Sequence, residues 1–484
     1  MNILLINPPH KSIGSRLAKE HLPPLGLLSI GGPLIDNGYN VKLLDADYGN
    51  MPLDEIVHET LDFNPDAVLM GHSGSTSAQP IINEIAKLIK SGKPEMTIIV
   101  GGVFPTFHWK EILESNPQID FVVCGEGEQI ILDLLYALEH KLDMEKVKGI
   151  AFRLQNVIMK TAPAEIITNL DAYRIGWELM GDYRYTYWGK KKAVVIQFSR
   201  GCPYPYSYCG QSKFWRTWRH RTPQLLADEI EMLHHRYGIE VINFADENPS
   251  TNQKVWIEFL KALIAKKLPI ILVGSIRADN VVRDAQYLHL YKQAGFERFL
   301  LGIENYNEAV LDKIKKTSSI KKDKEAIQLL RKHNILSMAT YVVGFGEETT
   351  STFYHSLKHL IEYDPDQIQL VYVTPHKWTP YFEEIRDKNI IQLDQTKWDY
   401  KHQIMEMINL RPWKVMLYVK LIELILQTRP KAIFRWLFHK DKRLRKAMSW
   451  YNNIGKRVWF YEWFQFFFRD NIINKPIPIN EFWK

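Results

Sequence analysis

The sequence predicts an α/β protein with an N-terminal doubly wound parallel sheet, a partial (βα)6 barrel and a mainly helical C-terminal region. Two patterns predict this fold. Short apolar segments alternate with amphipathic helical segments up to residue 140, and the same alternation starts again at residue 193. With 484 residues, the chain is also too long for a single core. We therefore expect α/β domains at 1–140 and 191–400, a linker at 141–190 and a C-terminal region at 401–484.

The composition is that of an ordinary folded protein, with 46% hydrophobic and 24% charged residues. The 3 cysteines exclude a disulfide framework and suit a reducing compartment. The N-terminus has neither a basic segment nor a cleavage site, and the chain has no apolar run of about 18 residues or more. These features predict a cytoplasmic protein without a transmembrane helix.

The N-terminal region has the βαβ rhythm of a parallel sheet. Its candidate strands lie at 2–6, 40–45, 66–70, 96–100 and 120–124. Small and polar residues follow these strands, at the sheet edge where ligands bind in such folds. The candidate binding residues are Asn7, Ser73, Ser75, Gly101, Gly102, Gly125, Glu126 and Gly127. Taken one at a time, these loops could equally be simple tight turns.

The second alternating region has six candidate strands. They lie at 193–198, 240–245, 269–275, 298–303, 337–343 and 367–373. Polar and glycine residues gather directly after the strands, where barrel enzymes place their chemistry.

Two cysteines follow the first strand of this barrel, in the segment Ser-Arg-Gly-Cys-Pro-Tyr-Pro-Tyr-Ser-Tyr-Cys-Gly. Cys202 and Cys209 occupy the first and third positions of a C-x3-C-x2-C loop, and Tyr206 occupies the middle position. Three thiolates at this spacing can hold a 4Fe–4S cluster and leave one iron open. Two cysteines alone could also form a two-thiolate metal site, or could simply be buried.

These segments together resemble the cobalamin-dependent radical S-adenosylmethionine (SAM) family. The Val-Gly-Gly-x-x-Pro-Thr and Gly-Glu-Gly-Glu segments resemble its cobalamin-binding domain, so the resemblance assigns the N-terminal loop residues to cobalamin. The chain has no Asp-x-His-x-x-Gly segment, and His72 and His108 are the histidines in suitable loops. The resemblance also implies a set of SAM-binding residues, namely Asp246, Glu247, Arg277, Glu304, Gly344 and Gly346. For each acidic residue the alternative is a carboxylate in the first turn of a helix.

A narrower resemblance begins beyond the cysteine loop. The Lys-Phe-Trp-Arg segment that starts at Lys213 is similar to the anaerobic magnesium-protoporphyrin IX monomethyl ester cyclases of bacteriochlorophyll and chlorophyll biosynthesis in photosynthesis. This resemblance implies an oxidoreductase that removes hydrogen from a propionate side chain and closes the isocyclic ring. It implies a tetrapyrrole substrate, an external electron donor, and SAM, cobalamin and a 4Fe–4S cluster as cofactors.

Tyr206 departs from the pattern of this family. A phenol has a reference pKa of about 10, against about 8.5 for a thiol, and it is a harder donor. Cys124 is no ready replacement, because it ends a strand of the other domain. The chain could be a relative that has lost radical chemistry, or it could assemble a cluster with Tyr206, water or another ligand. A third interpretation is a single-base variant, or an error, at a cysteine codon. A cobalamin-dependent methyltransferase and a non-catalytic tetrapyrrole- or cobalamin-binding protein are the alternative functions.

The C-terminal region is basic and rich in tryptophan. Residues 400–484 hold 17 Lys and Arg against 6 Asp and Glu, although the whole chain is only +7. Its tryptophans are Trp413, Trp436, Trp450, Trp459, Trp463 and Trp483. Such a region suits a flat apolar anion or a membrane surface, and it could also simply pack on the barrel. Nucleic acid is a less favoured partner, because no RNA-binding module is recognisable.

Overall fold

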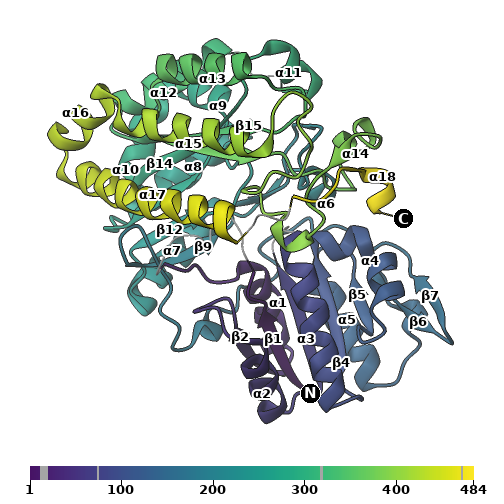
Figure 1. Ribbon diagram of the computed structural model, residues 1–484. Coiled ribbons are helices and arrows are strands. Elements are labelled where there is room, and N and C mark those ends of the chain that lie inside the picture. The colour runs from purple at the N-terminus through teal and green to yellow at the C-terminus, as the bar shows by residue number, and fades with distance from the viewer. Residues whose placement is uncertain (11–19, 73–75, 317–319, 470–472, 484) are drawn as a thin grey trace.

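The computed structural model describes residues 1–10, 20–72, 76–316, 320–469 and 473–483. Figure 1 shows two α/β domains, one above the other, with three C-terminal helices lying across the upper domain. The predicted fold class is confirmed by this arrangement.

The N-terminal domain is a seven-stranded sheet in the order β2-β1-β3-β4-β5-β6-β7. Its first five strands are parallel, as predicted, and β6 and β7 extend the sheet as an antiparallel hairpin. This hairpin falls within the expected linker. The strands are β1 (Asn2–Asn7), β2 (Asn40–Asp45), β3 (Ala67–His72), β4 (Thr97–Gly102), β5 (Phe121–Val123), β6 (Ile150–Leu154) and β7 (Val157–Lys160).

Strand alternation divides the core of this domain into two layers. Ile3 and Leu5 of β1 pack on one side of the sheet, whereas Leu4 and Ile6 pack on the other. Helices α1 (Leu25–Asp36) and α5 (Gly127–Glu139) cover the first side; α2 (Leu53–Phe63), α3 (Gln79–Gly92) and α4 (Val103–Ser115) cover the second. Each such side chain contributes about 1.5–3 kcal/mol by its burial.

The second domain is a sheet in the order β16-β15-β14-β13-β12-β9-β8, in which all strands but β8 are parallel to their neighbours. Within the described residues its two edge strands do not pair with each other, so it is a partial barrel. The strands are β8 (Thr186–Tyr187), β9 (Lys191–Ile196), β12 (Val241–Phe244), β13 (Ile271–Ser275), β14 (Phe296–Glu304), β15 (Leu336–Val343) and β16 (Gln367–Tyr372). The intervening helices are α7 (Pro223–Tyr237), α8 (Gln253–Ala265), α9 (Ala278–Arg283), α10 (Leu288–Ala294), α11 (Glu308–Lys313), α12 (Ile320–Lys332) and α13 (Thr350–Tyr363).

The C-terminal region is mainly helical, as predicted. Three helices, α15 (Pro412–Thr428), α16 (Pro430–Phe438) and α17 (Lys442–Phe468), run across the barrel (Figure 1). The buried Lys420 of α15 bonds to Glu462 of α17 and thereby joins two of them. The chain then returns to the N-terminal domain through α18 (Ile479–Phe482), where the ring of Trp483 stacks on His108 at 4.7 Å. None of the described helices is long and apolar enough to cross a membrane.

Candidate active site

A cavity of about 1100 Å³ lies between the two domains and the C-terminal helices. It takes in the carboxyl ends of the N-terminal strands and the lumen of the barrel. Val195 and Gln197 face it, for example, whereas Val194 and Ile196 pack outward against the helices. Six of the predicted cobalamin residues line it: Asn7, Gly101, Gly102, Gly125, Glu126 and Gly127. Ser73 and Ser75 lie outside the described residues.

The N-terminal loops fit a large ligand, because they present backbone to the cavity. Gly102 and Gly125 have φ angles of 110° and 125°, in the left-handed region that favours glycine. These loops can therefore approach a corrin ring closely. His108 does not line the cavity; it is buried against Phe104, and burial lowers the pKa of its imidazole. His72 ends β3, and its side chain lies outside the described part of the structure.

The glutamates of the Gly-Glu-Gly-Glu segment connect the two domains. Glu126 pairs with Arg219 at 2.7 Å and accepts the Ile167 N–H, while Glu128 pairs with Arg200. Arg200 and Arg219 lie on β10 (Ser199–Arg200) and β11 (Arg219–His220), the short strands that flank the cysteine loop. The cobalamin side of the cavity and the cysteine loop are thus held together by buried ion pairs.

The cysteine loop runs from β10 to the short helix α6 (Ser212–Trp215). Cys202 and Cys209 are free thiols; burial raises the pKa of Cys202 to about 11 and also raises the pKa of Cys209. Tyr206, between them, accepts a hydrogen bond from Arg277, and burial raises the pKa of its phenol. Among the described residues, no three His, Cys, Asp or Glu side chains converge as a metal site. Two thiols and a phenol held by arginine do not fit the three-thiolate set of such a cluster.

Arg277 is fully engaged with the protein. Its guanidinium lies 3.5 Å from the ring centre of Tyr204 and pairs with Asp279 at 2.7 Å, besides bonding to Tyr206. The sequence predicts that Arg277 faces the SAM carboxylate. That role stays a prediction; in the structure this side chain connects the cysteine loop to the segment that follows β13.

Asp246 and Glu247 follow β12 but have different surroundings. Asp246 is buried and accepts hydrogen bonds from the N–H groups of Phe198 (3.0 Å) and Ser199 (2.5 Å), so it fixes the start of the cysteine loop. Burial raises its pKa to about 6. Glu247 lines the cavity, has a buried oxygen without a hydrogen-bond partner, and has its pKa raised to about 7 by burial. Glu247 is therefore the acidic side chain of this pair that is available to a ligand.

The remaining predicted SAM residues lie at the ends of β14 and β15, and neither glycine nor Glu304 lines the cavity. Glu304 is buried, and burial raises its pKa. Gly344 and Gly346 donate their N–H groups to Glu348 at 2.6 and 2.9 Å. Glu348 organises this loop, and the Gly-x-Gly-x-Glu spacing was the signal that could have identified it.

Sequence reasoning missed the residues that line the barrel end of the cavity. The missed residues are Arg298 of β14 and Lys401 of a connecting segment. Trp450 of α17, one of the tryptophans named from the sequence, lines the same end. Arg298 could have been identified from the sequence, because it lies two residues before Leu300 on the same strand and therefore faces the same side.

Together, a B12-type sheet, a partial barrel with a cysteine loop and a shared cavity define the class of cobalamin-dependent radical SAM proteins. A model described as the B12 binding domain matches residues 14–135, and the Radical SAM superfamily model matches residues 196–360. A solved structure of OxsB with aqua-cobalamin and S-adenosylmethionine bound shares the fold, with a TM-score of 0.72 and 17% identity, and the match covers 95% of this chain and 72% of that one.

Two curated relatives narrow the class. The chain is 52% identical to an anaerobic magnesium-protoporphyrin IX monomethyl ester cyclase from Synechocystis sp., over 100% of this chain and 97% of that protein. It is 31% identical to the protein of that name from Rubrivivax gelatinosus, over 93% of this chain and 81% of that protein. Four relatives named as methyltransferases and one named as a methylase are only 23–25% identical to this chain. The chain belongs to the family of anaerobic magnesium-protoporphyrin IX monomethyl ester cyclases, which are oxidoreductases.

Proposed function

We propose that the protein is an oxidative cyclase for magnesium-protoporphyrin IX monomethyl ester and forms its isocyclic ring. The observation that carries the proposal is the single cavity lined by both domains and by the C-terminal helices. It brings the glycine loops, the cysteine-loop side of the barrel and an aromatic end with Tyr187, Trp436 and Trp450 into one space. The full-length similarity to a cyclase supports this substrate.

The protein's own residues would bind and orient the reactants. The glycine loops at Gly101, Gly102, Gly125 and Gly127, together with Asn7, would hold cobalamin, which supplies a redox-active cobalt ion when bound. Glu247 would accept a hydrogen bond from the amino group of SAM, because its buried oxygen has no other partner. Asp246 would position this site by fixing the strand end beside it.

Tyr206 supports a second candidate function, a cobalamin- and tetrapyrrole-binding protein without radical chemistry. Its phenol occupies the middle position of the cysteine loop and is held there by Arg277. The two candidates share their ligands and differ only in turnover.

The test compares the unaltered chain with the Y206C variant after anaerobic reconstitution of both. Each receives cobalamin, SAM, a reductant and the magnesium porphyrin monoester, and the pigments are then separated. We expect cyclised product from Y206C and at least about tenfold less from the unaltered chain. Cyclised product from Y206C supports the substrate. Cyclised product from the unaltered chain supports the cyclase, and its absence from the unaltered chain supports the binding protein without radical chemistry. Methylated porphyrin would replace the cyclase with a methyltransferase, and no product from a Y206C protein with about four irons and four sulfides would overturn the proposal.

We also propose that the protein takes its electrons from an external donor, because reductive cleavage of SAM consumes an electron that no described residue supplies. An assay without added reductant then gives no product from Y206C.

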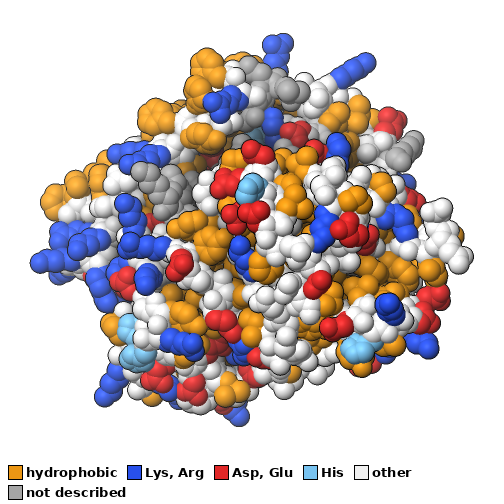
Figure 2. All heavy atoms as spheres, turned by 90° about the horizontal axis from the view of Figure 1, so that it is seen from below, with side chains coloured by type: hydrophobic (Ala, Val, Ile, Leu, Met, Phe, Trp, Pro, Cys, Tyr) orange, Lys and Arg blue, Asp and Glu red, His pale blue; other side chains and the backbone are white. Residues whose placement is uncertain are grey.

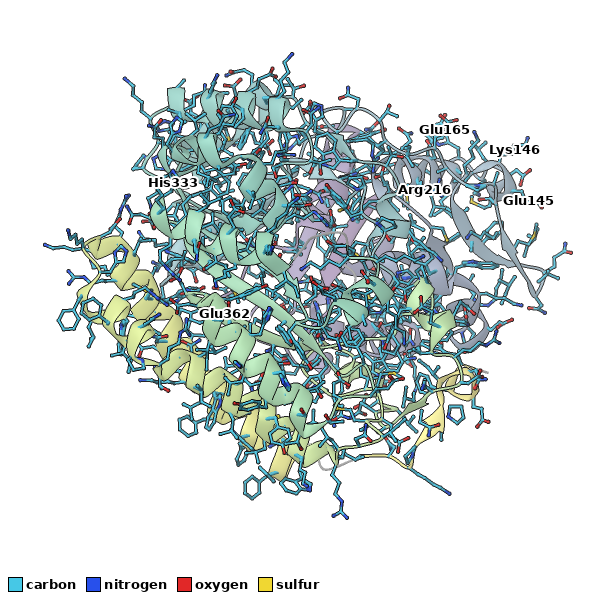
Figure 3. The ribbon with its side chains drawn as sticks, turned by 90° about the horizontal axis from the view of Figure 1, so that it is seen from above. Glu145, Lys146, Glu165, Arg216, His333 and Glu362 are labelled. Carbon is cyan, nitrogen blue, oxygen red and sulfur yellow. The ribbon has the colours of Figure 1, made fainter. Side chains whose placement is uncertain are left out.

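We further propose that the protein binds peripherally to the surface of an anionic membrane. Large hydrophobic side chains of α16 and α17 are exposed, and ring side chains project outward from these helices in Figure 3. Figure 2 shows Lys and Arg side chains gathered with hydrophobic ones at one side of the molecule. The exposed residues include Phe434, Leu437, Phe438, Phe460, Phe464 and Phe468. Such a face would bind anionic vesicles and not neutral ones, and serine at Phe434 and Phe438 would abolish the binding.

A further inference from the structure

Arg298 points into the lumen of the barrel. Strand β14 alternates, so that Phe299 and Leu301 pack outward in the helical core while Arg298 and Leu300 line the cavity. The arginine lies near the start of this strand, whereas the predicted SAM residue Glu304 lies at its end.

The guanidinium of Arg298 is buried and has no carboxylate among its contacts in the described part of the chain. The residue is only 7% exposed. Its Nη2 donates to the hydroxyl of Tyr187 at 2.7 Å, and its central carbon lies 5.0 Å from the ring centre of Trp188. Its Nε is buried without a hydrogen-bond partner. A buried cation with an unused donor is unfavourable unless something else supplies the opposite charge.

Two other buried arginines near the domain interface, unlike Arg298, form ion pairs with carboxylates. Arg200 also lines the cavity and is paired with Glu128, and Arg219 beside it is paired with Glu126. The protein therefore provides carboxylates for its buried arginines at the domain interface. For Arg298 it provides aromatic faces, and the described residues make no ion pair with it. Glu20, which also lines the cavity, instead accepts hydrogen bonds from the Gly189 N–H and from Trp450 Nε1.

The walls around Arg298 define the rest of the ligand. Trp450 packs on Tyr187 and Trp188 with ring centres at 5.4 and 5.0 Å. Apolar and aromatic side chains line this end of the cavity: Tyr187, Leu300, Met338, Ile368, Trp436 and Trp450. These walls suit a flat apolar body, and a guanidinium suits a carboxylate because both are planar and can form two parallel hydrogen bonds.

We propose that Arg298 binds the free carboxylate of the tetrapyrrole substrate and so fixes the orientation of the macrocycle in the cavity. This inference rests on the proposed function, since a monoester of a porphyrin dicarboxylic acid keeps one free carboxylate. Its esterified carboxylate cannot pair in this way. Arg298 would thus select the monoester over the diester and determine which side chain is presented for reaction.

The experiment uses the cobalamin-loaded full chain and two probes, magnesium-protoporphyrin IX monomethyl ester and the corresponding dimethyl ester. Binding is followed by porphyrin fluorescence in the unaltered protein and in the variants R298M, R298K and R457M. Arg457 is an exposed arginine of α17 and serves as the matched control. Melting temperature and retained cobalamin report whether each variant is folded.

We expect the unaltered protein and R457M to bind the monoester about 10- to 100-fold more tightly than the diester, the range of a charge-assisted hydrogen bond. R298M should bind both esters equally, and R298K should keep part of the preference. The comparison of the two esters on the unaltered protein needs no variant, so an unfolded R298M would leave the inference testable.

Two outcomes overturn the inference without touching the proposed function. One is tight but equal binding of both esters by the unaltered protein. The other is an R298M variant that keeps the ester preference and loses affinity for SAM, which would assign the anion to the carboxylate of SAM. If neither ester binds, the proposed tetrapyrrole substrate fails, and the role of Arg298 fails with it.

Discussion

The guanidinium of Arg277 donates a hydrogen bond to the phenol oxygen of Tyr206, in the middle of the cysteine loop. This contact links a loop that follows β9 to the end of β13, and it occupies the position at which the family pattern has a thiolate. The phenol of Tyr206 and the guanidinium of Arg277 therefore face each other inside the cysteine loop.

The Tyr206–Arg277 contact should stabilise the fold. In Y206F the buried guanidinium loses an acceptor, and we expect the free energy of unfolding to fall by about 1–2 kcal/mol. Urea denaturation of the protein without cofactors measures this change. Y204F is the matched control, because it keeps the ring that stacks on Arg277. Equal stabilities of Y206F and Y204F would show that the phenol contributes nothing.

The ion pair between Glu126 and Arg219 should hold the two domains together. E126Q leaves the charge of Arg219 unpaired at a buried site, so we expect a loss of about 3 kcal/mol and faster proteolysis between the domains. E165Q is the control: Glu165 is 92% exposed, meets Lys148 at 3.7 Å and lies at the edge of the molecule in Figure 3. An E126Q protein as stable and as resistant as E165Q would contradict this role.

His376 should make stability depend on pH below neutrality. Burial lowers the pKa of His376 to about 3, so between pH 3 and the reference value of 6.5 the unfolded chain binds a proton that the folded protein excludes. The stability is thus fully present above pH 6.5 and is lost as the pH falls, by about 1.4 kcal/mol per pH unit. In H376N this part of the slope should disappear between pH 6.5 and 5. A slope in H376N equal to that of the unaltered protein would refute the assignment.

Glu247 should bind SAM. We expect E247Q to weaken SAM binding about tenfold, because a charge-assisted hydrogen bond becomes a neutral one, while cobalamin retention stays the same. Isothermal titration of SAM measures this effect, with E258Q on α8 as the control. If E247Q binds SAM as tightly as E258Q does, the SAM amino group has another partner.

The sequence by itself determined the fold class, and it predicted the loops that carry the candidate cofactor residues. The spacing of apolar residues along the chain predicts the strands and helices. Glycines such as Gly102 and Gly125 mark loops in which the backbone turns with positive φ. The pair Cys202 and Cys209 is also a local pattern. Each of these features depends on neighbours in the sequence, so its signal survives without tertiary information.

Only the tertiary structure decided what the charged residues do. Glu126 meets Arg219 from another domain, Asp246 meets the end of β9, and Arg298 lies among aromatic rings of β8 and α17. A charge is defined by its surroundings, since burial and an opposite charge determine whether it is a structural partner or a ligand site. Those surroundings are assembled from segments far apart in the chain, and no local pattern encodes them.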